Sequence, residues 1–334
     1  MHFIPSISVV MSIYNEPEEW LRESIESILN QTFTDFEFII INDNPERQLN
    51  DALLNEYQKK DSRIVIIKNE ENIGLTKSLN KGLEIAKGEY IARMDGDDIS
   101  LKDRFDKQYN YLNSHPKYVV CGSNAIIINK KNRKAGNYKV PTLHNEIYNY
   151  IVYNNPMIHP SLLIRRKALI KNQLTYNEEF LYSQDYDLIS RLAMLGKLAN
   201  IEYPLIRYRI SNQQISTSKR KKQQKFANNV RINFILKNQN KIPIHINKID
   251  FNSFNKMQTV LERIVNLKNN SDTFHKYLLL SIITNMHIST IWIIMKLLFK
   301  TDFNFSLKEK IKIGKATFMN NILLMLFTPI SFII

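Results

Sequence analysis

The chain of 334 residues contains a single cysteine, Cys121. One cysteine excludes an intramolecular disulfide and a zinc site built from several cysteines. Because Cys121 lies in the apolar run YVVCGS, we interpret it as a buried structural residue rather than a nucleophile. Its isolation gives no indication of an oxidising compartment.

Lysine and arginine are absent from the first 15 residues, and acidic residues are few in the last third of the chain. The apolar start, MHFIPSISVVMSIYN, has no basic region and no small-residue cleavage site, so we interpret it as a first strand rather than a signal peptide. Residues 1–199 carry 25 Lys and Arg against 26 Asp and Glu, whereas residues 200–334 carry 21 against 6. The excess that gives the formal charge of +14 therefore lies in the C-terminal part and predicts an anionic partner there.

Apolar runs and amphipathic segments alternate along the first 100 residues. The β-branched runs predict strands at 7–13, 36–41, 64–68 and 90–94. Apolar residues at helical spacing lie between these runs, and the first helix is predicted to be capped by Asn15. This order is typical of a doubly wound α/β fold with parallel strands. Farther along, helices are predicted at 102–114, 183–196 and 216–240, and a strand at 118–128.

Polar side chains follow three of these strands, at Tyr14-Asn15, at Asn42-Asp43 and in the stretch ARMDGDDIS. Ligands of such sheets bind beyond the carboxyl ends of the strands, so these clusters predict a site. Asp95 and Asp97, separated by a glycine, can reach one small volume, where Mg²⁺ or Mn²⁺ relieves their repulsion. The alternative is a solvated acidic turn with Asp98 as the N-cap of the next helix.

Three segments in this order resemble the family 2 glycosyltransferases of the GT-A fold: SVVMSIYNEPEEWLRESIESILNQTFTDFEFIIINDN, NIGLTKSLNKGLEIAKGEYIARMDGDD and SQDYDLISRL. The resemblance covers residues 6–215, and the branch is similar to bacterial enzymes that build capsule, lipopolysaccharide or exopolysaccharide. It implies a Rossmann-like mixed, mainly parallel sheet flanked by helices. A nucleotide-binding half over 1–128 and an acceptor half over 129–215 are expected, followed by a mostly helical extension over 216–334.

The resemblance also implies an inverting hexosyl transfer from a UDP-sugar, assisted by a divalent cation, Mn²⁺ or Mg²⁺. Ser12 and Tyr14 match positions that line the nucleotide base, and Asp43 matches the aspartate that binds the uracil N–H. The family usually has two aspartates where this chain has Asn42-Asp43, so only Asp43 is assigned.

The same resemblance implies the phosphate and metal contacts. Asp95 is expected to contact the ribose, or the metal through water, and Asp97 to bind the metal directly. Lys77, on the helix after NIG, either faces the diphosphate or is a solvated helix lysine.

On the acceptor side, Asp185 matches the general base and Gln184 replaces an acid that the family carries before it. Asp187 is the alternative base. We expect the helix start to lower the pKa of Asp185. His159 either contacts the acceptor or the diphosphate or is a packed histidine. The segment RYRISNQQIS (207–216) resembles the flexible segment that closes over the site in the family. Ser211 in this segment stands where some relatives have a metal-ligating histidine, so no third protein ligand is assigned there.

The C-terminal region combines a basic run, KRKKQQK, with apolar stretches at 277–300 and 317–334. We expect interfacial helices held by lysines at anionic lipid heads; spanning helices and a bundle packed on the catalytic domain are the alternatives. The predicted location is the cytoplasmic face of a bacterial inner membrane, with a glycan or lipid-linked glycan as acceptor. No nucleic-acid-binding motif accompanies the basic run.

The sequence disfavours two other classes of function. A nucleotidyltransferase needs a glycine-rich phosphate loop after the first strand, and SIYNEPEEW contains no glycine. A degenerate protein that only binds a nucleotide-sugar or a glycan is expected to lack Asp97 or Asp185, and both are present.

Overall fold

The structure is a computed structural model, and it describes residues 4–211 and 220–238. Of these, the residues up to Val230, apart from Val152–Asn154, form one compact unit, whereas Val152–Asn154 and residues 231–238 belong to a second. The predicted domain boundary at 215 and the apolar stretches at 277–300 and 317–334 lie outside the described residues. No helix in the described ranges is long and apolar enough to cross a membrane.

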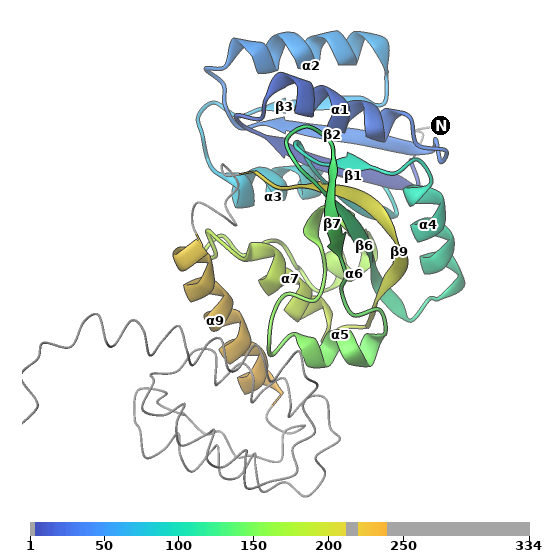
Figure 1. Cartoon of the computed structure of the whole chain (residues 1–334), viewed down its shortest axis with the longest axis vertical. Coiled ribbons are helices and arrows are strands. Elements are labelled where there is room, and N and C mark those ends of the chain that lie inside the picture. The colour runs from blue at the N-terminus through green and yellow to red at the C-terminus, as the bar shows by residue number, and fades with distance from the viewer. Residues whose placement is uncertain (1–3, 212–219, 239–334) are drawn as a thin grey trace, which may run out of the picture. The chain divides into compact units, whose positions relative to one another are not determined.

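Within these ranges, nine strands form one mixed sheet in the order β3-β2-β1-β4-β8-β6-β9-β5, with β7 paired to β6 (Figure 1). The strands are β1 (Ile7–Ile13), β2 (Phe36–Asn42), β3 (Ile64–Lys68), β4 (Tyr90–Asp95), β5 (Ile99–Ser100), β6 (Tyr118–Ile128), β7 (Lys134–Tyr138), β8 (Leu163–Arg165) and β9 (Lys197–Arg209). The helices are α1 (Glu18–Leu29), α2 (Gln48–Lys60), α3 (Leu75–Ile85), α4 (Arg104–Ser114), α5 (His144–Tyr150), the 3-10 turn η1 (His159–Ser161), α6 (Arg166–Lys171), α7 (Gln184–Leu192) and α9 (Arg220–Lys237).

The first four strands are parallel, as the alternation of apolar runs predicts. β1 pairs with β2 and with β4, and β2 pairs with β3, all in parallel register. Every residue of β1 is buried, which explains its uninterrupted apolar run. The carboxyl ends of β1, β2 and β4 therefore meet at one edge of the sheet, where the predicted polar clusters lie.

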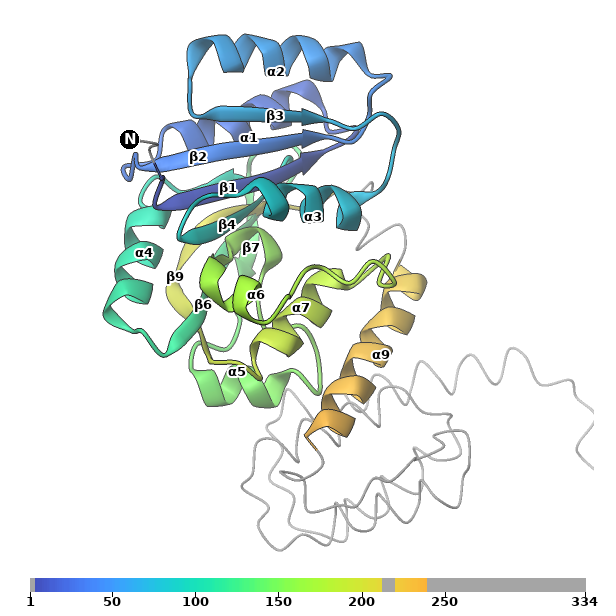
Figure 2. The ribbon, with the colours of Figure 1, turned by 180° about the vertical axis from the view of Figure 1, so that it is seen from behind.

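Helices cover both faces of this parallel part. α1, α2 and α4 pack against Val9, Met11 and their neighbours on one face, in a single apolar cluster. α3 packs on the other face, where a Cβ on Gly82 would lie 2.5 Å from Cγ1 of Val10. Figure 2 shows α3 on the near side of the strands and α1 on the far side. Such two-sided cover is what fixes the positions of the strand ends.

The second half of the sheet is mixed. β8 runs antiparallel to β4 and to β6, and β6 runs parallel to β9. Residues 207–209, expected to begin a flexible segment over the site, instead complete β9, and Arg207 pairs with Ile99 of β5. The predicted basic helix is present as α9.

The predicted cap of the first helix is wrong by two residues. α1 begins at Glu18 with Pro17 at the N-cap, not with Asn15. The Oδ1 atom of Asn15 accepts a 2.9 Å hydrogen bond from Nδ2 of Asn44, so this side chain joins the ends of β1 and β2 instead of the helix start.

Candidate active site

An acidic turn, Asp95 to Asp98, follows β4. Asp98 is buried, and its Oδ1 accepts a 2.7 Å hydrogen bond from the backbone N–H of Arg209. It is not a helix N-cap, because α4 begins six residues later with Asp103 in that position. Burial, reinforced by the charges of Asp97 and Asp95, raises the pKa of Asp98 well above its usual range. Asp95 and Asp97 are partly exposed, so they are the carboxylates of the turn that a ligand can reach.

A buried arginine compensates part of this negative charge. Arg93 lies two residues before Asp95 on the same face of β4, and its side chain is 2% exposed. Its Nη2 lies 2.5 Å from Oδ1 of Asp95. Burial of a charge is tolerated when a partner of opposite sign is this close, so the pair fixes the Asp95 carboxylate at the end of the strand.

Sequence reasoning missed a further carboxylate, Glu16. Its Cδ lies 3.3 Å from the position that a Cβ on Gly96 would occupy, so it borders the acidic turn. Burial, and to a smaller extent the charge of Asp95, raise the pKa of Glu16. Its place directly after the Tyr14-Asn15 cluster at the end of β1 is the signal that could have found it.

The residues predicted to line the nucleotide base lie at the same edge of the sheet. Ser12 of β1 is in register with Asp95 of β4, and it is buried. Tyr14, one residue beyond β1, is 44% exposed, which leaves a ring available for stacking. The structure thus brings Ser12, Tyr14 and Asp95 together.

Asp43 lies at this edge as well, but its carboxylate is engaged by the chain itself. Its Oδ1 accepts hydrogen bonds from the backbone N–H of Ile73 at 2.9 Å and from Nδ2 of Asn69 at 2.8 Å. Its Oδ2 accepts one from the N–H of Gly74 at 2.9 Å. Asp43 therefore holds the loop that leads into α3, and its contact with uracil stays a prediction.

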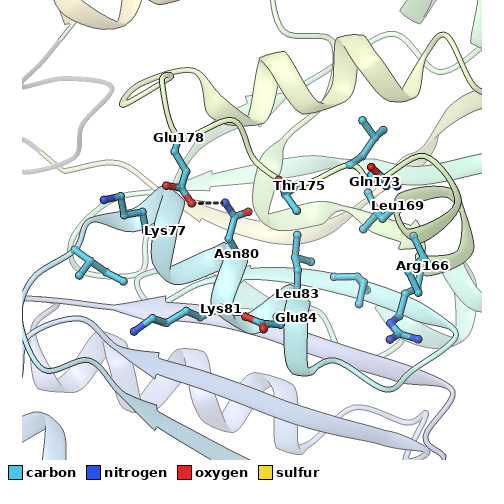
Figure 3. A pocket seen from close by; sticks show the side chains of 14 residues that line it. Lys77, Asn80, Lys81, Leu83, Glu84, Arg166, Leu169, Gln173, Thr175 and Glu178 are labelled. Atoms are coloured by element: carbon cyan, nitrogen blue, oxygen red, sulfur yellow. Dashed lines mark hydrogen bonds between the residues drawn. The ribbon is translucent and has the colours of Figure 1, made fainter.

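Lys77 lines a separate pocket of about 600 Å³ between α3 and the segment that includes α6 (Figure 3). The pocket walls also carry Lys81, Glu84, Arg166 and Glu178, with apolar side chains between them. The predicted contact of Lys77 with a diphosphate stays a prediction, because this pocket is lined by none of the acidic-turn residues.

Asp185 lies in the first turn of α7 and is partly exposed. Nδ2 of Asn155 donates a 2.7 Å hydrogen bond to its Oδ2. The expected lowering of its pKa is wrong. Burial raises the pKa of Asp185 more than the backbone hydrogen bonds of Tyr186 and Asp185 lower it, and the charge of Asp95 raises it further. A carboxylate with a raised pKa is a better proton acceptor.

The other acceptor-side residues have structural partners or are buried. Asp187 forms an ion pair with Arg191 one turn later in α7, at 2.7 Å, and Gln184 is buried. Nε2 of His159 lies 2.8 Å from the hydroxyl of Tyr176, whose ring it contacts edge to face. Burial, and then the charge of Arg93, lower the pKa of His159 well below its usual value, so its imidazole is neutral. Ser211 is buried directly after β9.

The two carboxylate groups lie within electrostatic reach of each other, since the charge of Asp95 acts on the pKa of Asp185. Both side chains are partly exposed, yet burial is the main influence on Asp185. No group of three or more His, Cys, Asp and Glu side chains in the described part of the chain is arranged to hold a metal ion.

The chain is similar to known glycosyltransferases. The family model of glycosyl transferase family 2 matches residues 8–174. An uncharacterized glycosyltransferase of Methanocaldococcus jannaschii is 42% identical over 229 residues, which are 67% of this chain and 77% of that protein. The amylovoran biosynthesis glycosyltransferase AmsE of Erwinia amylovora is 33% identical over 63% of this chain and 78% of its own length.

Among solved structures, S. aureus TarS 1–349 in complex with UDP-GlcNAc superposes with a TM-score of 0.55 at 15% identity, covering 96% of this chain and 92% of that one. At this identity the likeness concerns the fold, and it confirms the predicted GT-A architecture. The resemblance inferred from the three sequence segments is confirmed too, and the chain belongs to glycosyl transferase family 2.

Proposed function

We propose that this glycosyltransferase moves a hexosyl group from a UDP-sugar to a hydroxyl of a glycan acceptor, with inversion at the anomeric carbon. The observation that carries the proposal is the position of Asp95 and Asp97 at the end of β4 and of Asp185 in the first turn of α7, near enough for the charge of Asp95 to act on Asp185. Inverting transfer needs one group of side chains at the leaving UDP and a separate general base at the acceptor, because the leaving group and the base act on opposite sides of the anomeric carbon.

In the proposed complex, Ser12, Tyr14 and Asp43 lie at the nucleotide base, Asp95 at the ribose, and Lys77 at the diphosphate. The oxygens of Asn42 and of Asp43 both accept hydrogen bonds within the chain, so the assignment of the uracil N–H to Asp43 rests on the family resemblance.

The acidic turn fits a divalent cation with few protein ligands. Asp97, assisted by Asp95, supplies hard oxygen donors, which Mg²⁺ and Mn²⁺ accept, while the remaining positions suit diphosphate oxygens and water. Oδ2 of the neighbouring Asp98 is buried and has no hydrogen-bond partner among the described residues, and the raised pKa of Asp98 shows that the turn disfavours further negative charge, which a bound cation would relieve. A bound cation stabilises the charge that develops on the departing UDP.

Asp185 is the proposed base. As the acceptor oxygen bonds to the anomeric carbon and the bond to UDP breaks, its carboxylate takes the acceptor proton. The hydrogen bond from Asn155 fixes the carboxylate, and the raised pKa increases its basicity. Asp187 is the weaker candidate because it is paired with Arg191. Gln184 and His159 are proposed as acceptor or diphosphate contacts.

The acceptor is proposed to be a precursor of a surface polysaccharide, in line with the amylovoran function of the relative AmsE. We place the protein at the cytoplasmic face of the bacterial inner membrane, where lipid-linked precursors are found. The positive charge of residues 200–334 supports contact with an anionic membrane surface.

Release of UDP from UDP-GlcNAc, UDP-glucose and UDP-galactose, with and without Mn²⁺, tests the reaction, and NMR of the product anomer tests inversion. We expect Mn²⁺-dependent release and an inverted product. Retention of configuration, or full activity of Asp185→Asn, would contradict the mechanism. UDP binding without turnover of any donor would favour a binding protein of the same fold.

A further inference from the structure

Two tyrosines outside the predicted site lie on strands that flank β6. Tyr138 is the last residue of β7 and is in register with Ala125, whereas Tyr208 of β9 is in register with Ile127. Ala125 and Ile127 are two residues apart on one strand, so both tyrosines lie on the same face of the sheet. Their ring centroids are 6.0 Å apart and the rings meet at 78°. They form one aromatic surface, which we name the tyrosine wall.

The tyrosine wall lies beside the acidic turn, because Arg207 pairs with Ile99 and the backbone N–H of Arg209 donates to Asp98, and Tyr208 stands between these two residues. Burial and then the charge of Asp185 raise the pKa of Tyr138. Burial raises the pKa of Tyr208 as well, followed by the charges of the acidic-turn carboxylates, with Asp98 first. These influences agree with the position of Tyr208 beside the turn, and Tyr138, whose ring meets that of Tyr208, is the member of the pair on which the charge of Asp185 acts.

Tyr138 is also accessible. Tyr138 is 38% exposed, so a ligand can reach its ring. Exposed aromatic rings lose little conformational entropy on binding and offer a large apolar area. The other residues of β7 are small or polar, so Tyr138 is the aromatic residue of this strand.

We propose that the tyrosine wall binds a pyranose ring of the acceptor by stacking, so that the acceptor is a cyclic sugar rather than an acyclic polyol or a protein side chain. This inference rests on the proposed function. The attacking hydroxyl has to lie between the base and the donor sugar, and the tyrosine wall borders both. The C–H groups of a pyranose form an apolar face that packs on an aromatic ring, which an acyclic polyol does not present in a fixed shape.

Saturation-transfer NMR on the full chain with UDP and Mg²⁺ tests this, using the methyl β-pyranosides of glucose, galactose and N-acetylglucosamine as probes and mannitol for comparison. We expect transfer to ring C–H protons of at least one pyranoside in the wild type and in Tyr138→Phe. We expect an about three- to tenfold weaker affinity in Tyr138→Leu, the range of one aromatic contact. Mannitol is expected to give no comparable signal.

Tyr203→Leu is the matched control, because Tyr203 lies on β9 and is 71% exposed but is not part of the tyrosine wall. It should bind the pyranosides as the wild type does. Equal pyranoside affinity in Tyr138→Leu and wild type, or equal signals from mannitol and the pyranosides, would overturn the inference. UDP binding measured by calorimetry on each variant reports folding, and a wild type that binds no UDP would instead contradict the proposed function.

Discussion

The backbone N–H of Arg209 donates a 2.7 Å hydrogen bond to Oδ1 of Asp98, which lies 111 residues earlier in the chain. The Arg209 side chain adds a 2.6 Å bond from Nε to the carbonyl of Asp97 and a 2.7 Å ion pair with Glu23. Its guanidinium lies 4.8 Å from the ring centroid of Trp20 on α1. The end of β9 therefore holds the acidic turn against α1, and the site depends on a contact between segments far apart in the sequence.

Replacing Arg209 with Met should destabilise the fold strongly. The side chain is fully buried, and its loss removes the donor to Oε2 of Glu23 and to the Asp97 carbonyl, which costs about 3–5 kcal/mol. Urea denaturation measures the change. The control is Arg22→Met on α1. The ion pairs of Arg22 with Glu18 and Glu56 are partly exposed, so their loss should destabilise the fold far less. Similar losses for both variants would show that Arg209 has no special role.

Asp185→Asn should reduce transfer and stabilise the protein at neutral pH. The pKa of Asp185 is raised in the folded state, so its ionised form opposes folding above that pKa. The penalty fades as the pH falls through the folded pKa and is absent below the unfolded value of 3.8. Thermal melts should therefore show a higher Tm for Asp185→Asn at neutral pH and no difference in acid.

The rate of Asp185→Asn should fall by about 10²- to 10⁴-fold, as for loss of a general base. The wild-type rate should decrease as the pH falls through the raised pKa, because protonated Asp185 accepts no proton. Asp187→Asn provides the comparison. If Asp187→Asn loses the rate and Asp185→Asn keeps it, the base is Asp187.

Chelation of the divalent cation should stop transfer without unfolding the protein. Stabilisation of the leaving diphosphate contributes several kcal/mol, so we expect a loss of about 100-fold or more in EDTA, restored by Mn²⁺ or Mg²⁺. Asp97→Asn should need more Mn²⁺ for half-maximal rate. Asp103→Asn, exposed at the start of α4, should not. Unchanged activity in EDTA would exclude a role for the cation.

Asp43→Asn should weaken both the fold and UDP binding. An amide NH₂ would face the N–H of Ile73 or Gly74, and such an unsatisfied buried donor costs about 1–3 kcal/mol. Glu70→Gln, exposed in the same loop, is the control. Denaturation and UDP calorimetry separate the two effects. A stability loss with unchanged UDP affinity would show that Asp43 stabilises the loop and does not bind uracil.

Much of the fold could be predicted because the signal is local. Strands 64–68 and 118–128 were expected with the bounds that β3 and β6 have, since apolar runs and their polar borders reflect burial of the strand itself. The strand-end positions of Ser12, Tyr14, Asp43 and Asp95 followed from the same pattern. Pairings across long separations were not predictable, and so the last residues of β9 were expected to be flexible when they in fact pair with β5.

The sequence by itself determined which residue types follow which strands, because the alternation of apolar and polar residues depends on neighbours a few positions away. Only the tertiary structure decided their electrostatics. Glu16 borders Gly96, Asp185 is desolvated, and the ring of Tyr138 meets that of Tyr208 because segments far apart in the chain pack together there. Desolvation and Coulomb interactions depend on distance in space, which the order of residues does not contain.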